Sequence, residues 1–88
     1  MLSPNGGENW RHGQKRTIQW SSTGVVGNVR IDLARDGVNY AETIAASTVN
    51  DGVDVWAVTG PATQNARIRV CTVDLSRCDT SNGAFKIK

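Results

Sequence analysis

Histidine, cysteine and proline are scarce in this chain of 88 residues, which contains one histidine, two cysteines and two prolines. A nucleophilic triad would need His12, but this histidine lies beside a loop glycine with no serine or cysteine elbow motif near it. The eight acidic residues are scattered over turns, where aspartate serves turn geometry, and they form no recognisable carboxylate pair. We therefore expect neither an enzyme nor a cofactor.

Long apolar runs, internal repeats and low-complexity tracts are also missing. No run is long enough or apolar enough to cross a membrane as a helix, so we expect no membrane insertion. The net charge of +2 does not argue for nucleic acid as a partner. Because a chain of this length forms one small domain, we expect residues 1–88 to be a single monomeric module that belongs to a larger secreted protein.

Aspartate residues in the expected loops suggest a calcium site, but only as an alternative. Asp51, Asp54, Asp74 and Asp79 lie in or near loops, from which calcium commonly takes oxygen ligands. There is no EF-hand pattern, and turn chemistry explains these residues equally well. The sequence therefore assigns no metal site.

The two cysteines flank a short polar loop, residues 72–77. Cys71 and Cys78 are either a redox or metal-binding pair or the disulfide of a hairpin in a secreted domain. The CxxC spacing and any partner ligands are absent, which favours the disulfide. This interpretation also predicts an extracellular or cell-surface location.

Alternation of polar and apolar residues along short segments predicts an all-β domain. Segments 17–20, 29–34, 53–58, 66–73 and 85–88 alternate in this way, and 40–46 is a weaker strand expected at a sheet edge. Turn residues separate the segments, and helical periodicity is absent. About seven short strands with turns between them predict an antiparallel β-sandwich of the immunoglobulin or fibronectin-III type.

The core is expected to consist of the apolar residues that share the inward faces of these strands. It comprises Trp10, Ile18, Trp20, Ile31, Leu33, Trp56, Val58, Ile68, Val70, Phe85 and Ile87. Trp10 differs from the others because it stands alone in a polar stretch. It either folds back over one end of the core or is exposed for binding.

The opening stretch Ser-Pro-Asn-Gly-Gly-Glu, at 3–8, continues through Trp10 and Gly13 to Ile18 and Trp20. It resembles the start of the Ser/Thr-rich GPI-anchored membrane family domain. Members include fungal cell-wall β-glucan assembly proteins and modules of secreted bacterial and archaeal proteins. Segments 29–33, 50–58, 66–70 and 79–87 also fit the family pattern, which depends on a framework and implies no catalytic site. Asp54, where the family usually has an aromatic or aliphatic residue, and the cysteine pair depart from it.

Cations on the outward faces of three strands form the candidate binding residues. Alternation points Arg30, Arg67, Arg69 and Lys86 outward, with Asp32 as their main counter-charge at the surface. This face is either an ordinary solvated sheet surface or a weak docking surface for an anionic partner. If all three tryptophans are core residues, Tyr40 is the one aromatic side chain left to stack on a sugar.

We therefore expect a non-catalytic accessory module of a larger secreted protein. It would serve structural spacing, cell-surface attachment or substrate targeting. Its partners would be a polysaccharide or cell-wall component, or neighbouring domains of the parent protein. The alternatives are a carbohydrate-binding module of a polysaccharide-degrading enzyme and a protein-binding adhesion domain.

Overall fold

The computed structural model describes residues 2–21 and 27–88 and shows an all-β domain, as predicted. The described residues form β1 (Asn9–Trp10), β2 (Lys15–Gln19), β3 (Val29–Ala34), β4 (Glu42–Thr48), β5 (Val53–Ala57), β6 (Thr63–Thr72), β7 (Cys78–Thr80) and β8 (Phe85–Ile87). They contain no helix, and hence no helical segment that is a candidate to cross a membrane.

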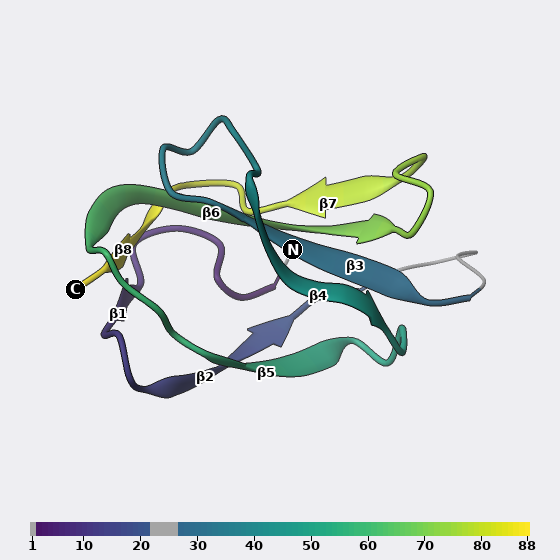
Figure 1. Cartoon of the computed structure of the whole chain (residues 1–88), viewed down its shortest axis with the longest axis horizontal. Coiled ribbons are helices and arrows are strands. Elements are labelled where there is room, and N and C mark those ends of the chain that lie inside the picture. The colour runs from purple at the N-terminus through teal and green to yellow at the C-terminus, as the bar shows by residue number, and fades with distance from the viewer. Residues whose placement is uncertain (1, 22–26) are drawn as a thin grey trace.

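The strands form two sheets that lie on opposite sides of the core (Figure 1). The larger sheet has the order β1-β8-β6-β3-β4, and β7 also pairs with β6. The smaller sheet is the antiparallel pair β2-β5. All pairs are antiparallel except β1 with β8, which is parallel. The expectation of purely antiparallel sheets is therefore wrong at one edge, because the opening stretch runs beside the last strand in the same direction.

All the apolar residues predicted for the core are buried, and Ile18 and Phe85 have no exposed surface. Trp10 is buried as well, which decides between its two interpretations. Its ring centroid lies 6.2 Å from that of Trp56 on β5 and 5.1 Å from that of Phe85 on β8. Tilted aromatic contacts at these distances are favourable. Trp10 therefore connects the smaller sheet to the edge of the larger one.

Two glycines allow the opening stretch to lie directly against the closing one. A β-carbon added at either Gly6 or Gly83 would come within 3.3 Å of the other glycine's α-carbon. The Gly83 amide donates a hydrogen bond of 2.8 Å to the Asn5 carbonyl. The Glu8 carboxylate accepts hydrogen bonds from the Asn5 and Gly6 amides at 2.8 and 2.7 Å. These contacts fix the turn that leads into Trp10.

The predicted disulfide joins β6 to β7. Cys71 and Cys78 are directly opposite each other in the antiparallel ladder, and their sulfur atoms are bonded. The bridge closes a hairpin whose short returning strand, β7, has only three residues. The hairpin thus places a covalent link at one end of the larger sheet.

The first prediction concerns the aromatic contact between the sheets. Trp56→Ala should lower the free energy of unfolding by about 3–5 kcal/mol, because it removes a buried indole from both Trp10 and the core. Val55→Ala is the matched control, since Val55 lies next to it on β5 and is 61% exposed. Urea denaturation should show a change within about 0.5 kcal/mol for this control.

If Trp56→Ala is too unstable to fold, Trp56→Phe provides the measurement, because it should lose less of the free energy of unfolding. A Trp56→Phe protein as stable as the wild type, together with a Trp56→Ala protein that melts at the wild-type temperature, would contradict the role given to Trp56.

Candidate binding face

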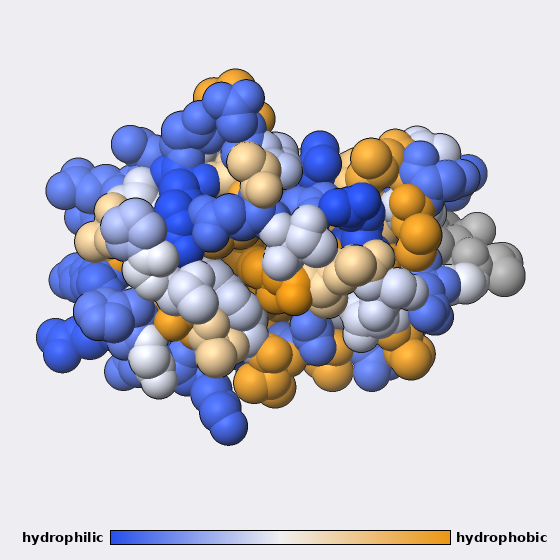
Figure 2. Space-filling view, viewed as in Figure 1, coloured by the Kyte–Doolittle hydropathy of each residue, from blue (hydrophilic) through white to orange (hydrophobic). Residues whose placement is uncertain are grey.

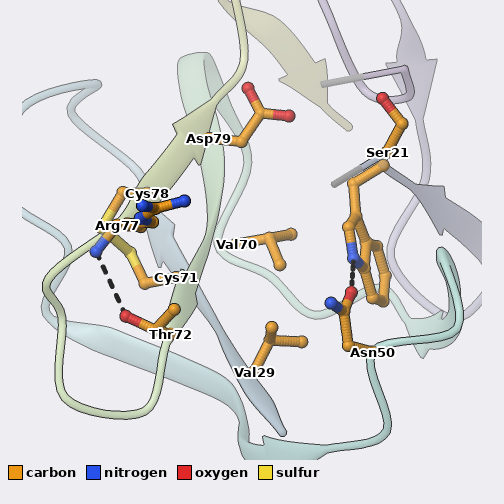
Figure 3. A pocket seen from close by; sticks show the side chains of 10 residues that line it. Ser21, Val29, Asn50, Val70, Cys71, Thr72, Arg77, Cys78 and Asp79 are labelled. Atoms are coloured by element: carbon orange, nitrogen blue, oxygen red, sulfur yellow. Dashed lines mark hydrogen bonds between the residues drawn. A yellow bond between two sulfur atoms is a disulfide. The ribbon is translucent and has the colours of Figure 1, made fainter. Parts of the chain in front are cut away.

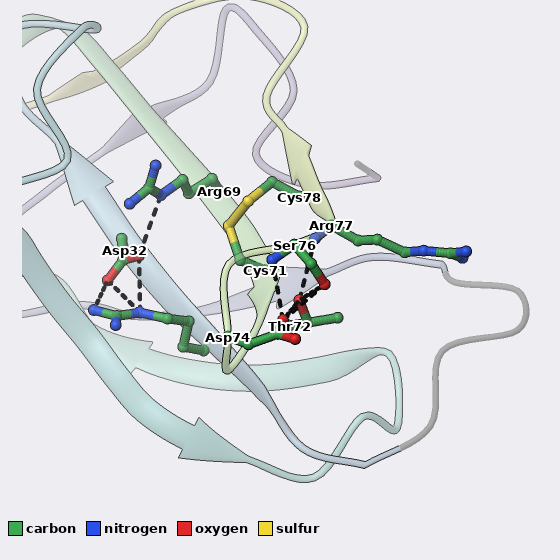
Figure 4. The surroundings of a disulfide bond; sticks show 9 residues. Asp32, Arg69, Cys71, Thr72, Asp74, Ser76, Arg77 and Cys78 are labelled. Atoms are coloured by element: carbon green, nitrogen blue, oxygen red, sulfur yellow. Dashed lines mark hydrogen bonds and ion pairs between the residues drawn. A yellow bond between two sulfur atoms is a disulfide. The ribbon is translucent and has the colours of Figure 1, made fainter.

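An arginine–aspartate cluster occupies the centre of the outer face of the larger sheet. Asp32 lies on β3, Arg30 precedes it by two residues on the same face, and Arg69 is its partner across the ladder on β6. Arg30 donates to the Asp32 carboxylate from Nη2 at 2.9 Å and from Nε at 3.1 and 3.3 Å. Arg69 donates from Nε at 3.2 Å (Figure 4). Both carboxylate oxygens therefore have guanidinium partners.

The burial of Asp32 corrects the expectation of a surface counter-charge. Its side chain has no exposed surface, whereas the side chains of Arg30 and Arg69 are each 27% exposed. Alternation along β3 predicts correctly that Asp32 points away from the core, but the arginine side chains extend over it. The cations therefore form the solvent-facing layer of the cluster, and the acid lies beneath them.

The partly exposed Tyr40 ring has a guanidinium group over one side. The Arg69 guanidinium carbon lies 4.5 Å from the centre of the Tyr40 ring, in a cation–π contact. Tyr40 precedes β4, so this contact ties the β3–β4 connection to β6. Arg30 is held from the same side, because its Nη2 donates to the Thr43 hydroxyl on β4 at 3.2 Å.

The other two predicted binding residues lie in different places. Arg67 lies two residues before Arg69 on β6, and its Nε lies beside Gly37 in the β3–β4 turn. Lys86 lies on β8, which pairs with the beginning of β6, and it shares a separate shallow hollow with Lys88 and Gln64. The structure therefore gathers Arg30, Arg67 and Arg69, which we call the arginine cluster, and leaves Lys86 apart from it.

The loop of the hairpin beside the cluster is held by hydrogen bonds among its own residues. The Asp74 carboxylate accepts hydrogen bonds from the Thr72 hydroxyl at 2.6 Å and from the Ser76 hydroxyl and amide at 2.7 and 3.0 Å. These bonds, with that of Thr72 the largest cause, lower the pKa of Asp74 to about 2. Val73 and Leu75 are 50% and 46% exposed at the tip of this loop. The sequence signals the hairpin through its cysteines but not this apolar tip.

A hollow of about 210 Å³ lies on the inner side of the same hairpin. Figure 3 shows Asn50 and Cys78 on opposite sides of it, with Val29 and Val70 between them. The Trp20 indole nitrogen donates to the Asn50 side-chain oxygen at 2.8 Å and so closes one wall. Because Val29 and Val70 point inward, this hollow is separated from the arginine cluster by the larger sheet.

The outer face of the smaller sheet has a different character. Val53 and Val55 on β5 are 46% and 61% exposed, and Figure 2 shows apolar side chains along the edge of the molecule that β5 occupies. The exposed Lys15, Thr17 and Gln19 on β2 pair with Ala57, Val55 and Val53, so polar and apolar side chains lie side by side on this face.

The candidates for chemistry named from the sequence are His12 and the acidic and cysteine side chains. His12 uses its Nδ1 in a 2.9 Å contact with the Lys88 carbonyl. No group of three histidine, cysteine or acidic side chains in the described ranges is placed to hold a metal ion. Comparison with protein-family models, curated proteins and solved structures finds no match to this chain.

The second prediction tests the cluster as a structural unit. Arg30→Ala should lower the free energy of unfolding by about 1–3 kcal/mol, because it leaves the buried Asp32 carboxylate short of hydrogen bonds. Lys86→Ala is the control, since it removes the same charge from an exposed position on the same sheet. Equal unfolding midpoints for the two variants in urea would show that Arg30 does not stabilise the buried Asp32 carboxylate.

The third prediction concerns acid. Since the pKa of Asp74 is lowered from 3.8 to about 2, the stability that its hydrogen bonds provide is fully present above pH 3.8. It should be lost as the pH falls toward about 2. A carboxyl NMR titration should give a midpoint near about 2 for Asp74. In Thr72→Val the midpoint should move back toward 3.8. The same midpoint in both proteins would contradict the role of Thr72.

Proposed function

We propose that this chain is a non-catalytic accessory module of an extracellular or cell-surface protein. It would have an immunoglobulin- or fibronectin-III-like β-sandwich of the Ser/Thr-rich GPI-anchored membrane family type. Its work would be spacing, attachment or substrate targeting for the larger protein. The opening motif, the strand order and the disulfide all support this proposal.

Strand order supports the proposed sandwich type. In immunoglobulin-like domains the third, sixth and seventh strands lie side by side in one sheet. Here β3, β6 and β8 are neighbours, in the order β8-β6-β3, while β2 and β5 form the opposing pair. The additional strand β4 extends the sheet beyond β3, as the extra strand of variable-type domains does.

The use of the acidic side chains is the observation that carries the non-catalytic proposal. General acids, bases and nucleophiles need a carboxylate that faces a substrate. Here the carboxylates of Glu8, Asp36 and Asp74 accept hydrogen bonds from their own turns. Those of Asp32 and Glu42 pair with arginines on the larger sheet or next to it. These five acids thus stabilise the fold.

The carbohydrate-binding alternative finds support only in a charge-based form. Trp10, Trp20, Trp56 and Phe85 are buried, and the Tyr40 ring is in contact with Arg69. These are all the phenylalanine, tryptophan and tyrosine residues of the chain, so a site built on stacking would have to use the part of the Tyr40 ring that Arg69 leaves uncovered. Recognition of a glycan would have to use the polar outer face of the larger sheet.

The fourth prediction tests the accessory role directly. The purified chain, incubated with neutral and acidic polysaccharides and with unfolded protein, should release no sugar or peptide products. Free-thiol titration of the denatured, unreduced protein should find no thiol, as expected for a domain of oxidising compartments. Product release that disappears on heat denaturation would contradict the non-catalytic proposal. Two free thiols in protein secreted from its host cell would contradict the extracellular one.

A further inference from the structure

We propose that the arginine cluster is a binding site for the carboxylate groups of an acidic polysaccharide. This inference rests on the proposed extracellular accessory role and names the ligand class that the module would recognise. It depends on three features of the cluster: donors that remain available, charge that remains uncompensated, and side chains that are already held in place.

Each guanidinium group uses only some of its N–H donors for hydrogen bonds within the cluster, and the others remain available. Arg69 uses Nε for Asp32, and Arg30 uses Nε and Nη2 for Asp32 and Thr43. Among the described residues, both Nη atoms of Arg69 and Nη1 of Arg30 have no hydrogen-bond partner, and both side chains are 27% exposed. A guanidinium edge with paired N–H groups matches a planar carboxylate through two parallel hydrogen bonds.

The charge of the cluster remains positive after its internal pairing. Three arginines and one aspartate leave two positive charges on this part of the sheet. Of the neighbouring acids, Glu42 is paired with Arg35, whereas Asp36 accepts hydrogen bonds only from neutral groups in its own turn and keeps its negative charge. Counted with Asp36, this part of the surface remains net positive, and an anion would meet that charge.

Positioning distinguishes these arginines from ordinary surface cations. Long flexible side chains lose rotamer freedom when they bind, and that loss weakens binding. Arg69 is already held between the Asp32 carboxylate and the Tyr40 ring, and Arg30 between Asp32 and Thr43. Part of the ordering has thus occurred before any ligand arrives.

The spacing of the cluster favours a polymer over a single small anion. Arg67 and Arg69 are two residues apart on β6, which separates their backbone positions by about 7 Å. Arg30 lies on β3 opposite Cys71 and is therefore a diagonal neighbour of Arg69, at about 7–8 Å. Single exposed ion pairs contribute little to affinity. Several weak contacts add up when the anionic groups are linked in one chain.

Flanking hydroxyl groups favour a polysaccharide over an acidic peptide. Thr80 on β7 is the ladder partner of Arg69, and Thr43 on β4 is the ladder partner of Asp32. The order Thr80, Arg69, Asp32, Thr43 thus forms one row across four adjacent strands. Hydroxyl groups on both sides of the arginine–aspartate pair suit a chain that carries both hydroxyls and carboxylates.

The fifth prediction uses immobilised polygalacturonate as the probe and its methyl ester as the uncharged control. Wild-type protein should bind the acid form and not the ester, and the binding should weaken steeply with salt. Arg67→Ala/Arg69→Ala should bind about 10-fold more weakly, since it removes two exposed pairs. Lys86→Ala/Lys88→Ala loses the same charge from the same sheet and should bind within about two-fold of wild type.

Two further variants separate binding from folding. Arg67→Ala alone leaves the Asp32 pairs intact and should still weaken binding. Arg69→Lys keeps the charge but loses the planar fork, and it should bind more weakly than wild type. Circular dichroism melting checks that each variant is folded.

Equal losses in the arginine and lysine double variants would overturn the site, as would equal binding of the acid and the ester. Tighter binding of polyglutamate than of polygalacturonate would overturn the assignment to a polysaccharide. No binding by the wild type would overturn this inference while leaving the accessory role intact, because that role is tested separately by product release and thiol titration.

Discussion

The contact of Trp10 with both Trp56 and Phe85 is the constraint on which the rest of the structure depends. A two-stranded sheet is at best marginally stable in water, so β2 and β5 persist because their inner face is covered. Trp10 comes from the opening stretch and Phe85 from the last strand, so one aromatic cluster sets the positions of both chain ends and of the smaller sheet. The turn at Asn5 and Gly6 positions this indole in the cluster.

A second constraint acts on the opposite side of the larger sheet. Removing the Asp32 carboxylate from water is costly unless its oxygens are hydrogen-bonded to cations. Arg30 and Arg69 meet that need, and in doing so they hold positive charge above a sheet instead of on a mobile loop. Groups mounted on strands are positioned more accurately than groups on loops. The same two arginines thus stabilise the buried Asp32 carboxylate and form part of the proposed recognition surface.

Sequence patterns predicted the core well because burial of residues such as Ile68 and Val70 follows directly from alternation along a strand. They did not predict β1 and β7, which have two and three residues and are too short to show a period. Alternation gave the direction of Asp32 but not its burial, because the covering atoms come from the side-chain ends of Arg30 and of Arg69, which is far away in the chain. The separation of Lys86 from the arginine cluster depends likewise on which half of β6 pairs with β8.

The parallel pairing of β1 with β8 has a mechanical consequence. A series of backbone hydrogen bonds links the opening stretch to the closing one, from the Gly83 amide with the Asn5 carbonyl to the His12 amide with the Lys88 carbonyl. Because the two segments run in the same direction, a pull on the two ends of the chain acts along the strands and loads these bonds in shear. The bonds would share the load together and would not open one after another. A module placed between neighbouring domains would thus resist stretching where its opening and closing stretches lie side by side.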